Sequence, residues 1–131
     1  MPHLTLEYTA NLSDKRPDAT LFVTLHRLLE SVAGIKIGNC KSRWRKTDEW
    51  VVGAGEGPSA FVHLDLRFME GRPEKVKQAL GMALLEILRA YFGPPQSGTD
   101  LQITVEIQDI RKVSYFKDPP GALGPPPTVM V

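Results

Sequence analysis

The hydrophobic residues of this chain change their spacing in a fixed order, and that order occurs twice. Residues 3–8 alternate between apolar and polar side chains, as a half-buried strand does. Residues 21–32 carry apolar side chains at the intervals of a helix, and residues 38–46 are typical of an extended, basic strand. The same succession follows in residues 61–68, 73–92 and 101–108. The chain is therefore predicted to contain two strand–helix–strand units in tandem.

Glycine and proline residues mark the ends of both predicted helices. The first helix ends near Gly34, and the second closes with Gly93 and Pro94. Pro73 is placed at the first helical position of the second helix, where its missing N–H group does no harm. These residues set the boundaries of the helices independently of the hydrophobic pattern.

The predicted fold belongs to the α/β (α+β) class. Each helix is long enough to cross between two parallel strands, and such crossovers are right-handed. The two units then form one four-stranded mixed sheet with both helices on one face. We expect a single domain over residues 1–118, with one unit at about 2–46, a connector at 47–59 and the second unit at about 60–110. A tail rich in proline and glycine follows at residues 119–131 and is expected to be extended.

The sheet face without helices is predicted to be polar. Such a face is either wet or lines the inside of an oligomer, and the spacing of the residues leaves both open. The residues expected on it are His3, Thr5, Glu7, Lys41, Arg43, Arg45, His63, Asp65, Arg67, Thr104 and Glu106.

Composition excludes several classes of protein. The 16 basic and 15 acidic residues give a formal net charge of +1, which argues against a partner such as nucleic acid. No apolar run approaches the roughly 18 residues needed to span a bilayer, and the chain starts without a secretory signal pattern. We expect a cytoplasmic protein with no membrane partner.

The sequence also offers few means of binding a metal or a cofactor. Cys40 is the single cysteine, and the 3 histidines lack the spacing of metal ligands. The glycine-rich residues 53–58 match neither the dinucleotide fingerprint nor the Walker pattern, and no helix follows them. We expect neither a metal nor a cofactor. Residues 53–58 are expected to form a turn or connector.

Pro2 is a candidate general base. Removal of Met1, which is expected before a small residue, would expose a secondary amine. An α-amino group has a pKa of about 7.7–8.0, and burial or nearby cations lower it, so such an amine is able to take and return a proton near neutral pH. The alternative is that Pro2 merely suits the start of a strand.

Basic residues supply candidate anion contacts. Lys41, Arg43, Arg45 and Lys46 follow one another in the second strand, where they suit carboxylates or phosphates, or simply protect a sheet edge. Arg72 precedes the second helix, whose N-terminal end already favours an anion. The position of Arg72 is best explained by an anion between it and the helix end, and the alternative is a side chain that points into solvent.

These features together resemble one enzyme family. The quoted segments are Met1-Pro2-His3, Lys41-Ser42-Arg43, Ala60-Phe61-Val62-His63-Leu64 and Gly71-Arg72. They are similar to the 5-carboxymethyl-2-hydroxymuconate Δ-isomerases of the tautomerase superfamily. The resemblance implies a homotrimer whose sheets face a central axis, no cofactor, and Pro2 as the catalytic base.

The resemblance also implies the substrate and its contacts. It indicates an unsaturated di- or tricarboxylic acid, 5-carboxymethyl-2-hydroxymuconate, from homoprotocatechuate breakdown, held by Lys41, Arg43 and Arg72. Lys41 stands where the family has an arginine, so it keeps the charge but lacks the planar fork. Two alternatives stay open: a related tautomerase acting on another enol acid, and a non-catalytic module that binds anions through residues 41–46.

Overall fold

The computed structural model describes residues 1–119. The predicted tail at residues 119–131 therefore lies, apart from Pro119, outside the described residues. Short 3-10 turns occur at Ala10–Lys15, Ile37–Asn39 and Lys112–Ser114. The regular elements are β1 (His3–Thr9), α1 (Ala19–Ala33), β2 (Lys41–Thr47), β3 (Ser59–Met69), α2 (Glu74–Phe92) and β4 (Asp100–Ile110).

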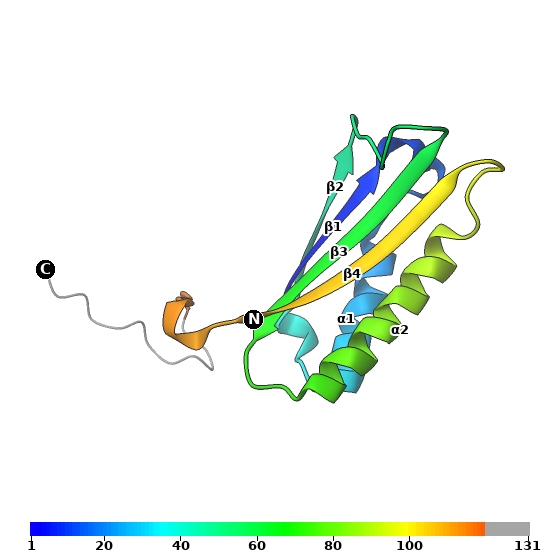
Figure 1. Ribbon diagram of the computed structural model, residues 1–131. Coiled ribbons are helices and arrows are strands. Elements are labelled where there is room, and N and C mark those ends of the chain that lie inside the picture. Colours follow the sequence, from blue (N-terminus) through cyan, green and yellow to red (C-terminus); the bar gives the residue numbers. More distant parts are fainter. Residues whose placement is uncertain (120–131) are drawn as a thin grey trace, which may run out of the picture.

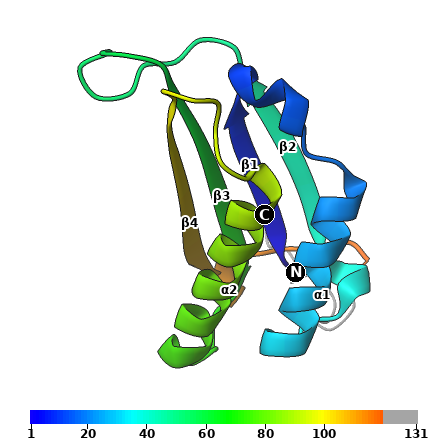
Figure 2. The ribbon, with the colours of Figure 1, turned by 90° about the vertical axis from the view of Figure 1, so that its right-hand side faces the viewer.

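The four strands form one sheet in the order β2-β1-β3-β4. β1 is parallel to β2 and β3 is parallel to β4, whereas β1 and β3 are antiparallel. Both helices lie against the same face of the sheet (Figures 1 and 2). The predicted tandem units, the mixed sheet and the one-sided helix layer are confirmed.

The core lies between the sheet and the two helices. Along β1 and β3 every second side chain is fully buried, as the alternating pattern predicts. The intervening side chains form the predicted polar face. The largest fully buried side chains are Phe68, Phe92, Leu4, Leu6, Leu25, Leu29, Leu64, Leu66, Leu80, Leu84, Leu88 and Val62.

The helix ends follow the local sequence with one correction. Asp18 caps α1 by accepting a 3.0 Å hydrogen bond from the Leu21 N–H, and Gly34 ends the helix with φ of 66°. Pro73 is not the first helical residue of α2, as predicted, but its N-cap, with ψ of 151°. Its carbonyl accepts the Lys77 N–H at 3.2 Å, so Pro73 closes the first turn from an extended conformation.

The second strand begins later than the predicted residue 38. Residues 37–39 form a 3-10 turn closed by a 3.0 Å hydrogen bond from the Cys40 N–H to the Ile37 carbonyl. The Lys41 N–H then donates to the Pro2 carbonyl at 3.1 Å. Because the β1 strand starts at His3, residues before Lys41 have little strand to pair with.

Neither helix within residues 1–119 is both long and apolar enough to cross a membrane. Across the same residues, no three histidine, cysteine, aspartate or glutamate side chains are grouped to hold a metal ion.

Candidate active site

A cavity of about 220 Å³ opens at the start of β1, on the helix side of the sheet. Pro2 is buried in its wall. The lining residues are Met1, Pro2, Gly34, Ile35, Lys36, Asn39, Phe68, Met69 and Arg72. They come from the start of β1, the end of α1, the turn before β2, and the segment joining β3 to α2.

Backbone pairing explains the position of Pro2. Its side chain shares the helix side of β1 with Leu4, because successive residues of a strand point to opposite faces. Its carbonyl is held by the Lys41 N–H, and its missing N–H group breaks no ladder hydrogen bond at the strand start. Pro2 is therefore fixed in place by β2.

Arg72 is held beside the same cavity by two contacts. Its Nε donates a 3.2 Å hydrogen bond to the Ala33 carbonyl, and its guanidinium carbon lies 5.1 Å from the centre of the Phe68 ring. Ala33 ends α1, where unpaired carbonyls and the helix dipole favour a cation. The sequence predicts an anion as the partner of this arginine, whereas in the structure the Ala33 carbonyl already accepts a hydrogen bond from it. Its two terminal amino groups have no hydrogen-bond partner within residues 1–119.

The electrostatic surroundings of the cavity favour a neutral amine. Burial lowers the pKa of the Met1 α-amino group below its ordinary value of 8.0, and the charges of Lys41 and Arg72 lower it further. In the chain that includes Met1, the nitrogen of Pro2 is an amide. An amine at Pro2 would be subject to the positive charges of the same two residues.

Lys41 and Arg43 lie elsewhere within one chain. Lys41 is exposed and donates from Nζ to the Asn39 carbonyl at 3.2 Å. Arg43 lies on the polar face, where its guanidinium contacts His3 at 2.9 Å and Thr5 at 3.4 Å. Neither residue lines the cavity. The positive charge of Lys41 nevertheless lowers the pKa of the Met1 α-amino group.

Comparison with known proteins decides the family. Residues 2–120 match the family profile of 5-carboxymethyl-2-hydroxymuconate isomerase. The chain belongs to this family.

Two isomerases are among its relatives. The 5-carboxymethyl-2-hydroxymuconate Delta-isomerase of Escherichia coli is 25% identical over 117 residues, which are 89% of this chain and 93% of that protein. A crystal structure of a 5-carboxymethyl-2-hydroxymuconate isomerase from Deinococcus radiodurans R1 has 33% identity and a TM-score of 0.79, over 88% of this chain and 87% of that one. This isomerase family membership agrees with the resemblance seen in the sequence.

The fold extends to other tautomerases. The crystal structure of native fused 4-OT has 19% identity and a TM-score of 0.65, over 88% of this chain and 91% of that one. At this identity the likeness shows the fold alone.

The candidate site also contains residues that were not predicted from the sequence. Ile35, Phe68 and Met69 give the cavity an apolar wall. The alternation of β3 predicts that Phe68 faces the helices, but only the packing places it beside Pro2. No signal in the sequence joins the end of α1 to the start of β1.

Proposed function

We propose that the mature chain moves a proton within an unsaturated hydroxy or oxo carboxylic acid, with Pro2 as general base. The observation that carries the proposal is that Pro2 and Arg72 line one cavity whose cations favour a neutral amine. The substrate we propose is 5-carboxymethyl-2-hydroxymuconate, because the Escherichia coli relative is named for it. Removal of Met1 is part of the proposal, since an amide nitrogen has no basic lone pair.

The proposed chemistry needs one base and no cofactor. The lone pair of the Pro2 amine takes the proton of a dienol hydroxyl, or of a carbon beside the conjugated carbonyl. In the dienol case, the O–H electron pair becomes the new C=O bond and the conjugated double bonds shift. The protonated amine then returns the proton to a carbon further along the chain of double bonds, so no atom is gained or lost.

Arg72 is the proposed carboxylate anchor. Its Nε is occupied by Ala33, but its terminal amino groups remain for an oxyanion in the cavity. Lys41 would add positive charge that stabilises the oxygen on which negative charge develops. Both cations would also keep the pKa of the Pro2 amine low.

We further propose a cytoplasmic homotrimer that takes part in homoprotocatechuate breakdown. One structural relative is described as a symmetric trimer of fused 4-OT, at 18% identity. A trimer with its sheets around an axis would cover the polar face of the sheet, which neither helix covers. Arg43 lies on that face, so it would reach a substrate carboxylate only across a subunit boundary. Residues 1–118 are proposed to act as a single domain.

The test uses untagged protein whose intact mass shows that Met1 is absent. Loss of the dienol absorbance of 5-carboxymethyl-2-hydroxymuconate measures turnover. Pro2→Ala leaves a primary amine in a different position and is expected to lower kcat by roughly 10²–10⁴-fold, the usual contribution of a general base. Pro58→Ala, an exposed position before β3, is the matched control and should retain activity. Full activity in Pro2→Ala would exclude Pro2 as the base.

The two alternatives make different predictions. A related tautomerase would turn over another enol acid faster in a panel of such substrates. An anion-binding module would show no turnover in processed protein, and its binding to a polyanion would fall steeply with salt.

A further inference from the structure

A second cavity, of about 670 Å³, lies on the polar face of the sheet. It shares no lining residue with the Pro2 cavity, because alternate residues of β1 and β3 face opposite sides. Its lining comes from all four strands and from the segment that follows β4. The lining residues are His3, Thr5, Arg43, Arg45, Asp65, Arg67, Asp109, Ile110, Arg111, Ser114 and Tyr115.

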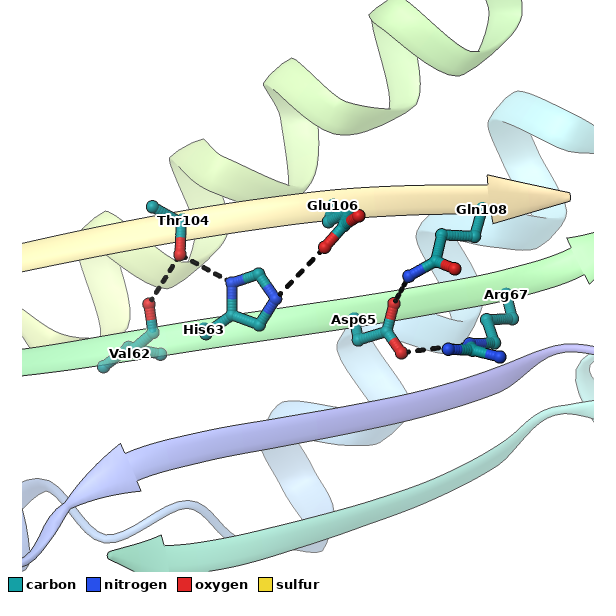
Figure 3. Close-up of polar contacts among 7 residues, drawn as sticks. All are labelled: Val62, His63, Asp65, Arg67, Thr104, Glu106 and Gln108. Atoms are coloured by element: carbon teal, nitrogen blue, oxygen red, sulfur yellow. Dashed lines mark hydrogen bonds and ion pairs between the residues drawn. The ribbon is translucent and has the colours of Figure 1, made fainter.

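The two carboxylates of this cavity already have partners. Asp65 accepts hydrogen bonds from the Arg67 Nε at 3.1 Å and the Gln108 amide at 2.9 Å (Figure 3). Asp109 accepts from the Lys77 Nζ at 3.2 Å. The positive charge of Arg67 is thereby compensated by the Asp65 carboxylate. No carboxylate within residues 1–119 pairs with Arg43, Arg45 or Arg111.

A chain of hydrogen bonds fixes the orientation of the groups at the cavity wall. Arg43 is able only to donate, so the His3 Nδ1, at 2.9 Å, must accept. The proton of neutral His3 therefore sits on Nε2, which donates to the Tyr115 hydroxyl at 2.8 Å. Burial and the Arg43 charge lower the pKa of His3, in agreement with a neutral ring. The hydroxyl proton of Tyr115 is left for another acceptor.

The segment that carries Arg111 is held at both of its ends. The Lys112 N–H donates to the Glu70 carboxylate at 2.8 Å, and Tyr115 is tied to His3. The backbone around Arg111 is therefore held in place at the wall of the cavity. Four guanidinium groups line this cavity beside the Tyr115 hydroxyl, and among the described residues only that of Arg67 has a carboxylate partner.

We propose that this second cavity binds a small anion with two or more carboxylate groups. Guanidinium forks pair with carboxylates in a bidentate manner, and three uncompensated arginines match the charge of a di- or tricarboxylate. The volume lies in the usual range for small-molecule sites, about 300–1,000 Å³. Within one chain the site shares no lining residue with the Pro2 cavity, and it does not depend on Pro2.

Calorimetric titration of citrate into the full, mature chain tests this site at constant ionic strength. We expect saturable binding that Arg45→Gln and Arg111→Gln each weaken by about tenfold, the effect of one lost charge-assisted contact. Arg27→Gln, an exposed arginine on α1 at the other face of the sheet, should not change the affinity. Pro2→Ala should bind citrate as the parent does, which separates this result from the fate of the proposed isomerase mechanism.

Four results would overturn the proposal. The first is heat no greater than that given by sodium chloride at the same ionic strength. The second is inorganic phosphate binding as tightly as citrate, which would contradict the polycarboxylate class. The third is a loss of kcat/KM for the dienol acid in Arg45→Gln and Arg111→Gln, which would assign the cavity to the isomerase site of an adjoining copy. The fourth is a changed oligomeric state in the two variants, seen by sedimentation, without saturable citrate binding in the parent.

Discussion

Arg72 donates from Nε to the carbonyl of Ala33 at 3.2 Å, and this hydrogen bond joins the start of α2 to the end of α1. The contact places a guanidinium at the mouth of the Pro2 cavity while it satisfies a helix-terminal carbonyl. One side chain thus serves the packing of the two helices and the electrostatics of the site.

Arg72→Lys is expected to lower kcat/KM for the dienol acid by about 10- to 100-fold. A charged hydrogen bond contributes roughly 1.5–3 kcal/mol, and lysine cannot hold Ala33 and a carboxylate with one planar fork. Steady-state kinetics measure the effect, and Arg27→Lys on the exposed side of α1 is the control. An unchanged kcat/KM would show that Arg72 does not contact the substrate.

Lys41→Gln should move the rising limb of the pH–rate profile to higher pH. Lys41 is among the charges that lower the pKa of the terminal amine, after burial, so its removal lets the amine keep its proton to a higher pH. In the proposed mechanism the free base is the active form, and kcat/KM measured across pH reports its pKa in the free enzyme. A limb that stays in place in Lys41→Gln would contradict this electrostatic link.

The free energy of unfolding should fall as the solution is acidified, in part because of His26. Burial lowers the pKa of His26 in the folded protein below 6.5, so the unfolded chain binds its proton more readily. The contribution of His26 to the free energy of unfolding is fully present above pH 6.5, and it is lost as the pH falls from there through the folded-state pKa of His26. Urea unfolding at several pH values should give a weaker pH dependence for His26→Gln than for the parent. His3 has a pKa lowered in the same direction and remains in both proteins, so equal slopes would exclude a contribution from His26.

Ser42→Ala tests the link between α1 and β2. The Ser42 hydroxyl lies 2.6 Å from the His26 Nε2, and its loss should lower the free energy of unfolding by about 1 kcal/mol. Thr24→Ala serves as the control, since its hydroxyl contacts only the preceding turn of α1. A Ser42→Ala effect no larger than that of the control would mean that water replaces the contact.

Leu64→Ala should destabilise the protein by about 2–5 kcal/mol. Leu64 is 0% exposed in the middle of β3, and truncation would leave a cavity between the sheet and the helices. Met82→Ala removes a side chain that is 74% exposed and should change stability by less than about 0.5 kcal/mol. Both variants are compared at one protein concentration, because assembly adds to apparent stability. Equal effects of the two would contradict the assigned core.

Side-chain spacing is a local property, and it predicted most of the architecture. The alternation in β1, β3 and β4 and the stripes along α1 and α2 identify the elements, their buried faces and the polar side of the sheet. Pro2 near the start of the chain and the Gly71-Arg72 pair also point, from the sequence alone, to the isomerase family. The alternation of side chains along β1 and β2 also predicts that His3 and Arg43 lie on the same face of the sheet.

What needed the tertiary structure was the meeting of residues distant in the chain. The antiparallel pairing of β1 with β3 brings the end of α1 beside the start of α2, which gives Arg72 the Ala33 carbonyl and places it near Pro2. The sequence could offer only an anion as the partner of Arg72, and strand alternation alone did not predict the hydrogen bond between Arg43 and His3. Local periodicity decides which way each side chain faces, whereas the order and direction of the strands decide what it meets, because those depend on packing energies summed over the whole chain.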